Sequence, residues 1–418
     1  MLQAMYSGVS GLEAHQQRLD VIGDNIANVN TTGFKAGTVT FEDTFSQVWQ
    51  GASAPSTAHG GTNPVQTGTG VKVGAIDTLQ TQGGLLSTSR PTDMALQGNG
   101  FFMLGNANGV SYTRNGSFSV DAKGSLVNSA DGSNVLGWQS AQDPKTGVYA
   151  VDTTQPITNQ SKISLPIGTL TSQEATHTVT YNGNLSADAA SGAAYSRNVK
   201  VYDSQGGAHT VALTFTKSAA NQWAFRAAVP TTTPADTATI TGSGTVAFDS
   251  NGKVIAPTSG AAALTVGANP AQSLTLDFSQ IGQVSGDSTV APTGQDGFPP
   301  GVLQSFSTDL TGAITGIFSN GQTRPLGQIA VAGFANPEGL AKVGGSQFQT
   351  TANSGVAKVG AAESGGLGEI STGYLEQSNV DLSREFTDMI VTQRGFQANT
   401  KVISTVDQLL NDVLQMKP

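Results

Sequence analysis

The stretch that decides the fold is residues 381–415, which read DLSREFTDMIVTQRGFQANTKVISTVDQLLNDVLQ. Its apolar residues recur at steps of three, four and seven, with polar Gln393 and Asn399 at intervening positions of the same stripe. Such spacing predicts an amphipathic helix. Ser378 and Asp381 have capping-box spacing, which predicts that the helix starts near Asp381. The stripe consists of Leu382, Phe386, Met389, Phe396, Ile403, Val406, Leu410 and Val413.

The N-terminal segment carries a matching pattern. Its apolar residues follow near-heptad spacing, with polar Gln16 in one stripe position, and predict a helix that stops at the turn-forming residues 30–33. Gly8, Gly11 and Gly23 lie inside this helix, where each costs about 1 kcal/mol relative to alanine. A neighbouring helix could approach closely at such positions because no Cβ atom intervenes. The stripe consists of Leu2, Met5, Val9, Leu12, Leu19, Ile22, Ile26 and Val29.

The residues between the two helices show the period-two pattern of β-strands. Residues 199–202 and 211–215 are strand-like runs on either side of the polar turn 203–207, which predicts a hairpin. Similar turns from Asp or Asn to Gly recur at residues 121–124, 249–252 and 319–321. Glycine near the end of each turn supplies the positive φ that many hairpin loops need. We therefore expect the whole interior to be antiparallel β-structure.

The two terminal helices are expected to pair, which would bring the chain ends together. The interior would then be nested, with one β-module inserted into another. The predicted fold class is mainly β, with nested antiparallel β-modules on a coiled-coil-like pair of N- and C-terminal helices. We place the helical domain at residues 1–35 and 376–418, and the middle β-domain at 36–170 and 301–375. The inserted outer β-domain is placed at 171–300, a segment rich in Thr, Ala, Ser and Gly.

Composition limits the classes of partner. The 418 residues include only 12% charged side chains, about half the usual share, and the net charge is −9 without a run of Lys or Arg. Nucleic acid and anionic membranes attract clustered cations, so neither is expected as a partner. The chain has no cysteine, no apolar stretch of membrane-spanning length and no N-terminal signal-peptide pattern. These features predict no disulfide, no membrane insertion and no cleaved signal peptide.

The sequence offers no convincing active site. A triad of Ser204, His209 and Asp203 can be drawn, but these residues flank one hairpin turn without a nucleophile-elbow pattern. The turn at 249–252 starts like a calcium loop and lacks the ligands that should follow. Residues 98–100 lack the third glycine of a dinucleotide-binding fingerprint. We therefore expect no catalytic residue, no metal site and no cofactor. The histidines, none with a second histidine at metal-ligand spacing, are His15, His59, His177 and His209.

Three motifs carry a resemblance to a known family. The first is DNIANVNTTGFK at residues 24–35, preceded by SGL at 10–12. The second is GYLEQSNVDL at 373–382, continued by IVTQRGFQAN at 390–399, and the third is DMALQGNGFF at 93–102. Together they resemble the signature of the rod and hook subunits of the bacterial flagellum. The matching residues of the first motif include Asn25, Asn28, Thr32, Gly33 and Phe34.

The resemblance implies a structural subunit, not an enzyme. Its members polymerise into a tube, and the inserted module with VYDSQG at 201–206 is similar to that of a hook subunit, which transmits torque from rod to filament. A distal rod subunit is the alternative, because the Gly-, Ser-, Thr- and Pro-containing stretch 47–69 resembles one found there. A secreted β-rich adhesin is the rival class, but it would not explain the two helical ends.

Partners and location also follow from the resemblance. It implies a helical homopolymer that contacts the distal rod protein, the hook cap and the hook–filament junction proteins. The flagellar type III apparatus would export the chain without cleaving a signal peptide, which places it outside the cell in the hook and basal body. The two helical stripes would mediate self-assembly in an innermost layer that lines the export channel.

Overall fold

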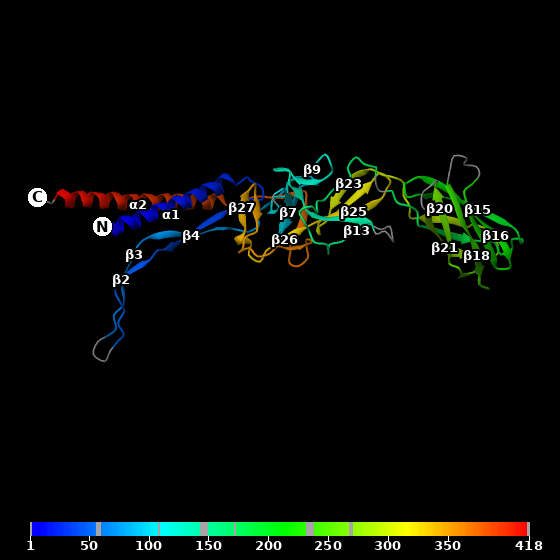
Figure 1. The fold of residues 1–418 in the computed structure, drawn as a ribbon, viewed down its shortest axis with the longest axis horizontal. Coiled ribbons are helices and arrows are strands. Elements are labelled where there is room, and N and C mark those ends of the chain that lie inside the picture. Colours follow the sequence, from blue (N-terminus) through cyan, green and yellow to red (C-terminus); the bar gives the residue numbers. More distant parts are fainter. Residues whose placement is uncertain are drawn as a thin grey trace.

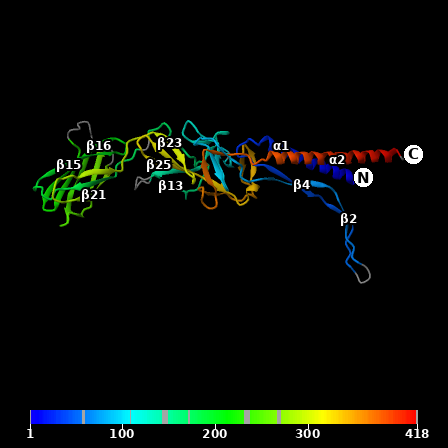
Figure 2. The same cartoon turned by 180° about the vertical axis from the view of Figure 1, so that it is seen from behind.

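The computed structural model describes residues 2–55, 60–107, 109–142, 149–170, 173–230, 238–266 and 271–415. The molecule is elongated, with the two helices at one end and a β-domain at the other (Figures 1 and 2). Helix α1 spans Leu2–Ala27 and α2 spans Leu382–Gln415, and both chain ends lie at the helical end of the molecule. The predicted fold class, mainly β with paired terminal helices, is confirmed. No helix of the described residues combines the length and apolarity needed to cross a membrane.

The helix boundaries have local causes. The Asp381 carboxylate accepts hydrogen bonds from the amides of Ser383 (2.9 Å) and Arg384 (3.3 Å), so Asp381 is the N-cap of α2. The Asn28 side chain donates to the Asp24 carbonyl oxygen at 2.9 Å, and α1 ends at residue 27, three residues before the predicted turn. Val29, predicted on the stripe of this helix, therefore lies in the turn that follows it.

A long hairpin follows α1. Strands β1 (Gly37–Asp43) and β4 (Val71–Thr78) pair antiparallel and pack along α1. Strands β2 (Ser46–Gln50) and β3 (Val65–Gly68) pair next, and this part of the hairpin projects away from the helices (Figure 1).

The middle of the molecule is built from two larger sheets and two short strand pairs. One sheet has nine strands, in which β26 and β29 join β7, and the other has the order β13-β12-β25-β24-β23. A 3-10 helix, η1, spans Pro337–Gly339. The first sheet contains β7 (Phe101–Asn106), β8 (Gly109–Thr113), β9 (Phe118–Val120), β10 (Leu126–Asn128), β11 (Asn134–Val135), β26 (Val331–Gly333), β27 (Ala341–Gly344), β28 (Gln347–Gln349) and β29 (Lys358–Gly360). The second contains β12 (Gly137–Gln142), β13 (Tyr149–Val151), β23 (Leu303–Thr308), β24 (Ala313–Phe318) and β25 (Thr323–Ile329). The short pairs are β5 (Leu85–Ser87) with β31 (Tyr374–Glu376), and β6 (Met94–Gln97) with β30 (Glu369–Thr372).

The far end is a nine-stranded sheet formed entirely from residues 178–295. Its first strand, β14, pairs with its last, β22, so the chain enters and leaves this part side by side. The predicted hairpin is confirmed, with Tyr202 opposite Ala208. The expectation of purely antiparallel strands is wrong, because β14 pairs parallel with β21. Six strands lie between these two in sequence, a connection long enough to return the chain in the same direction. The strands are β14 (Thr178–Asn184), β15 (Ala194–Tyr202), β16 (Ala208–Ala219), β17 (Gln222–Ala228), β18 (Ala238–Phe248), β19 (Val254–Ala256), β20 (Ser259–Val266), β21 (Gln272–Gly282) and β22 (Ala291–Gln295).

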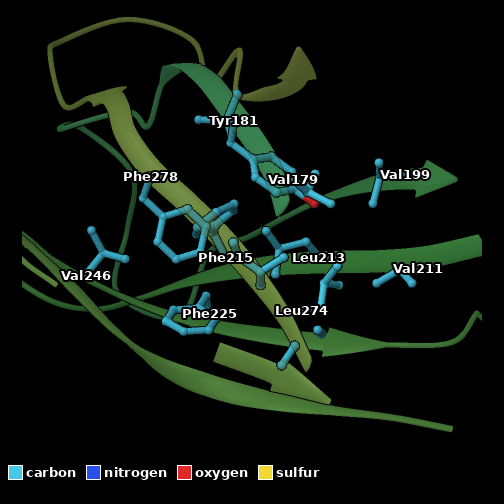
Figure 3. Packing of buried hydrophobic residues seen from close by; sticks show 14 of the residues in the cluster. Val179, Tyr181, Val199, Val211, Leu213, Phe215, Phe225, Val246, Leu274 and Phe278 are labelled. Atoms are coloured by element: carbon cyan, nitrogen blue, oxygen red, sulfur yellow. The ribbon is translucent and has the colours of Figure 1, made fainter. Parts of the chain in front are cut away.

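Each β-region has its own core. In the far sheet the rings of Tyr181, Phe215 and Phe225 surround Phe278, with centroids 6.0, 5.6 and 5.0 Å from its ring (Figure 3). All buried residues of this cluster fall between Val179 and Val290. The clusters of the middle region contain none of them and lie between residues 94 and 370.

One turn recurs four times in the β-regions. Asp121, Asp203, Asp249 and Asp309 each accept hydrogen bonds at Oδ1 from the amides two and four residues later. The glycine three residues after each aspartate has φ between 78° and 83°. The carboxylate thus replaces a missing backbone partner, and glycine tolerates the left-handed conformation.

Candidate assembly surface and domain junction

Helices α1 and α2 run antiparallel and approach closely where α1 carries glycine. A Cβ atom on Gly8 would lie 3.2 Å from Ile403 Cγ1, and one on Gly11 would lie 2.6 Å from Asn399 Nδ2. The prediction that missing Cβ atoms allow close approach is confirmed at these two positions. Gly23 has nothing within 4 Å of its Cβ position, so no close contact among the described residues requires glycine there.

The helix contact continues toward the β-regions through His15. A Cβ atom on Gly395 would lie 2.7 Å from the His15 ring, which also packs edge-on against Phe41 at 5.5 Å between centroids. Burial lowers the pKa of His15, and Arg18 lowers it further. The Arg18 Nη2 atom donates to Asp388 Oδ1 at 3.2 Å, which links the two helices again nearer the β-regions.

The predicted N-terminal stripe is only partly covered. Ile22 is buried, Val9 is exposed, and the side chain of Leu2 lies outside the described part of the structure. Instead of the stripe, Gly8, Gly11 and Ala14 are the buried positions in the first half of α1. The half-buried members of the stripe are Met5, Leu12, Leu19, Ile26 and Val29.

The C-terminal stripe is also incompletely covered. Val406 is buried, and Leu382, Phe386 and Val413 are exposed. The half-buried members are Met389, Phe396, Ile403 and Leu410. Further apolar side chains point to solvent from other sides of the helix pair. They are Tyr6, Ile390, Val391, Val402, Leu409 and Leu414. We call these six residues, together with Val9, Leu382, Phe386 and Val413, the exposed helical apolar set.

The motif residues Asn25 and Asn28 fix the chain as it leaves α1. Asn25 is buried, and its side chain exchanges two hydrogen bonds with the Gly37 backbone, at 2.9 Å to the carbonyl oxygen and 2.8 Å from the amide. Asn28 accepts a hydrogen bond from the Thr31 hydroxyl at 3.1 Å. Both asparagines therefore hold the turn between α1 and β1.

The next motif residues dock this turn on the middle β-region. The Thr32 hydroxyl donates to Asn115 Oδ1 at 3.1 Å, and the Gly33 amide donates to the Glu376 carbonyl oxygen at 2.8 Å. Gly33 has a φ of 68°, and a Cβ atom there would lie 2.5 Å from the Asn115 amide nitrogen. Phe34 lies under the Lys342 ammonium group, 4.9 Å from its ring centroid. Glycine is required at position 33 for both its conformation and its close contact.

A buried ion cluster lies directly behind this turn. Lys35 Nζ is 2.7 Å from Glu376 Oε1, and Arg114 Nη1 is 3.4 Å from Glu376 Oε2. The Lys35 and Glu376 side chains are 0% exposed, and that of Arg114 is 5% exposed. Burial lowers the pKa of Lys35 and that of Arg114, while Glu376 opposes the shift in both. One carboxylate thus joins the N-terminal motif, the C-terminal motif and the middle β-region.

Asn379 closes the same junction from the side of α2. Its Oδ1 accepts from the Ala36 amide at 2.8 Å, and its Nδ2 donates to the carbonyl oxygens of Leu79 (2.9 Å) and Thr81 (3.2 Å). We name Lys35, Arg114, Glu376 and Asn379 the junction cluster. The sequence reasoning missed their role, although three of them lie inside or directly beside the two terminal motifs.

The distal part of the hairpin has an exposed apolar surface. Phe45 is 90% exposed and Trp49 67% exposed, and Val48 and Val65 lie beside them in the strands. The stretch 47–69 that resembles the distal rod is therefore a two-stranded arm, except for residues 56–59, which fall outside the described part. Large apolar side chains in such a position are typical of a contact with another surface.

Asp203 and His209, two members of the rejected triad, have structural roles. His209 Nε2 lies 3.0 Å from Asp203 Oδ2, and the other oxygen of this carboxylate caps the amides of Gln205 and Gly207. Asp249 caps its own turn in the same way, which accounts for its likeness to a calcium loop. Among the described residues, no three His, Asp or Glu side chains are grouped as metal ligands would be. His59 lies outside the described residues.

Family comparisons first define the class of protein. Four families match: the Flagella basal body rod protein at residues 5–35, the Flagellar hook protein FlgE/F/G D1 domain at 95–187, the Flagellar basal body protein FlaE D2 domain at 169–298 and the Flagellar basal body rod FlgEFG protein C-terminal at 371–416. These matches cover both terminal helices and the far β-sheet. They define an axial subunit of the flagellum.

Relatives along the whole chain then specify the family. The chain is 39% identical to the flagellar hook protein FlgE of Treponema pallidum, with all of both chains covered. It is 38% identical to that of Salmonella typhimurium over 98% of each chain, and 37% identical to that of Escherichia coli over 99% of this chain and 100% of the relative. The chain belongs to the flagellar hook protein FlgE family. The fold resembles the crystal structure of Helicobacter pylori flagellar hook protein FlgE2, with a TM-score of 0.53, 16% identity, and coverage of 70% of this chain and 100% of that one.

Proposed function

We propose that the chain is the structural subunit of a flagellar hook, polymerising into a flexible tube that transmits torque from rod to filament and encloses the export channel. The observation that carries this proposal is the exposed helical apolar set at one end of an elongated molecule. Apolar side chains gathered on a helix pair and left in water mark an interaction surface. The matches along full-length hook relatives, inserted domain included, favour a hook subunit over the distal rod subunit.

We assign three domains to three radial layers. The helical domain, residues 1–35 and 376–418, would form the inner layer that lines the channel. The middle domain, 36–170 and 301–375, would form the wall, and the inserted domain, 171–300, would lie outermost and contact neighbouring subunits. The separate apolar cores of the middle and far β-regions support this division. The stripe residues on α1 and α2 are proposed as the self-assembly residues of the inner layer.

We extend the proposal to location and partners. The chain would be exported by the flagellar type III apparatus without cleavage, and it would act outside the cell in the hook of the basal body. Its main partner would be further copies of itself. The distal rod protein, the hook cap and the hook–filament junction proteins would contact it at the ends of the tube. Edman sequencing of the exported chain should begin at Met1 or Leu2, and a start beyond Gly8 would exclude uncleaved export.

Replacing Ile403 with aspartate tests the self-assembly role. Ile403 is half-buried against Gly8, so Ile403→Asp places a carboxylate where the two helices touch. We expect the variant to form no tubes in electron micrographs while the β-domains melt at the wild-type temperature. Ser404→Asp, which adds the same charge at the neighbouring exposed position, is the control and should still polymerise. Normal tubes from Ile403→Asp would refute the role. Straight, rigid wild-type tubes would favour the distal rod subunit instead.

A further inference from the structure

Arg324 is a half-buried arginine of the middle domain whose guanidinium group is incompletely hydrogen-bonded. It lies on β25, and its guanidinium carbon is 3.6 Å from the centroid of the Tyr149 ring and 5.2 Å from that of Phe318. Its Nε and Nη1 atoms are buried and make no hydrogen bond to any described residue. Buried donors without partners are unfavourable and rare in folded proteins, so this pair of donors calls for an explanation.

Arg114 is a better-partnered arginine of the same domain, although its Nε is also buried without a hydrogen-bond partner. It also lies over an aromatic ring, that of Phe101, at 5.3 Å. Its Nη2 donates to the Gly98 carbonyl oxygen at 2.7 Å, and its Nη1 pairs with Glu376. Arg324 has the aromatic support but neither the carbonyl oxygen nor the carboxylate.

Arg324 lines a cavity that has no acidic lining residue in the described part of the chain. The cavity has a volume of about 210 Å³ and lies between β12, β13 and β25, with Gln139, Ser140, Tyr149 and Pro166 among its lining residues. The Ser140 hydroxyl oxygen is buried there without a partner as well. The volume is several times the about 30 Å³ that one water molecule occupies, so a side-chain carboxylate fits. No residue that lines this cavity in the described part of the chain is acidic.

We propose that this cavity is a socket for the carboxylate of an Asp or Glu side chain from a second copy of the chain. This inference rests on the proposed function, because polymerisation is what would bring a second copy to the socket. A carboxylate in this cavity would pair with the Arg324 guanidinium group through charge-assisted hydrogen bonds. The chain supplies such groups in excess, with 29 acidic against 20 basic residues. Arginine and tyrosine are also among the residue types enriched at the interface positions that dominate binding.

Two substitutions of Arg324 in the full-length chain test the socket. Arg324→Met removes the charge and keeps the length, and Arg324→Lys keeps the charge with fewer donors. Sedimentation would give the critical concentration for tube formation, which should rise about tenfold or more for Arg324→Met and less for Arg324→Lys. Arg226→Met, at an exposed position on β17, is the matched control and should leave the critical concentration unchanged. The melting temperature of the monomer should change little in all three variants, because the Arg324 Nε and Nη1 atoms have no hydrogen-bond partner among the described residues.

The possible outcomes separate this inference from the proposed function. If the wild-type chain forms tubes and Arg324→Met leaves the critical concentration unchanged, the socket is overturned and the proposed function stands. A large loss of monomer melting temperature in Arg324→Met would also overturn it, since Arg324 would then act within its own chain. Sodium acetate or inorganic phosphate that stabilises only the wild-type monomer, with polymerisation unaffected by the substitution, would identify a free-anion site instead. A wild-type chain that forms no tubes would overturn the proposed function and the socket with it.

Discussion

At the scale of single residues, charge is scarce in this chain, and three charged side chains are buried together at one junction. Glu376 neutralises Lys35 and Arg114 at the point where three segments of the chain meet. Isolated buried charges are strongly destabilising, but a paired set with satisfied hydrogen bonds is tolerated. The Glu376 carboxylate also accepts from the Gly83 amide at 3.0 Å, so each of its oxygens has a partner. The junction therefore depends on one acidic side chain.

Glu376→Gln should destabilise the middle domain by about 3–5 kcal/mol, because two buried cations lose the counter-ion that they share. Urea denaturation of the full chain, followed by tryptophan fluorescence, measures this as a lowered midpoint. Glu13→Gln removes a carboxylate from the exposed side of α1 and should leave the midpoint unchanged. Equal midpoints for wild type and Glu376→Gln would mean that the cluster contributes no net stability.

The Asp203 turn makes the inserted domain sensitive to acid. Burial raises the pKa of Asp203, but hydrogen bonds from His209, Gly207 and Gln205 outweigh it and leave the pKa below the usual 3.8. A carboxyl whose pKa is lowered by folding stabilises the native state above its unfolded pKa, and this contribution is lost as the pH falls through the folded value. The melting temperature of the inserted domain should therefore drop below about pH 4. Asp203→Asn should melt lower at neutral pH and show a weaker decline between pH 5 and 3. A decline as steep as that of the wild type would assign the acid sensitivity to other groups.

At the scale of elements, the helix pair is held by small residues and not by a continuous apolar seam. Gly8 and Gly11 admit Ile403 and Asn399, and the exposed helical apolar set faces away from this contact. Helices that pack on each other with so little buried surface gain little from tertiary contacts, which normally supply most helix stability. Neighbouring subunits in a tube would supply the remainder.

Two alanine substitutions separate helix propensity from helix contact. Gly23→Ala should stabilise α1 by up to about 1 kcal/mol, because nothing lies within 4 Å of the new methyl group. Gly11→Ala should instead cost a net of about 1 kcal/mol, since its methyl group would lie 2.6 Å from Asn399 Nδ2 and overpacking outweighs the gain in propensity. Thermal melting of the helical circular dichroism signal in the monomer measures both. Equal stabilisation by both substitutions would show that α1 and α2 do not touch in solution.

At the scale of the whole molecule, the chain runs from α1 through the middle region to the far sheet and returns through the middle region to α2. The far sheet is continuous in sequence, whereas the middle region is assembled from two segments, in which β7 pairs with β26 and β12 with β25. The two regions are joined where Glu174 pairs with Phe298 and where Gln322 Nε2 donates to Glu174 Oε2 at 2.8 Å. Folding of the middle region therefore requires the chain segments on both sides of the inserted domain.

Residues 172–300 expressed alone should fold into a monomeric β-protein with a cooperative thermal transition. The first and last strands of this fragment pair with each other, and its apolar core lies wholly inside it. Residues 95–170 expressed alone are the control and should remain unfolded, because β7, β8 and β12 lack the strands from after residue 300 that complete their sheets. Circular dichroism melts of both fragments test this. A random-coil spectrum for 172–300, or a folded 95–170, would contradict the nested organisation.

The sequence by itself determined the elements and their class, because apolar periodicity and turn chemistry act over a few residues. It predicted both terminal helices to within a few residues, the hairpin at 199–215 and the flagellar axial family. It could not predict that α2 lies against Gly8 and Gly11 and not against the whole apolar stripe. Apolar spacing does not specify which face of a helix a partner covers. The parallel pairing of β14 with β21 and the meeting of Lys35, Arg114 and Glu376 depend on contacts between residues up to 341 positions apart. Only the tertiary structure decides these, because local spacing carries no information about which distant side chains are buried together.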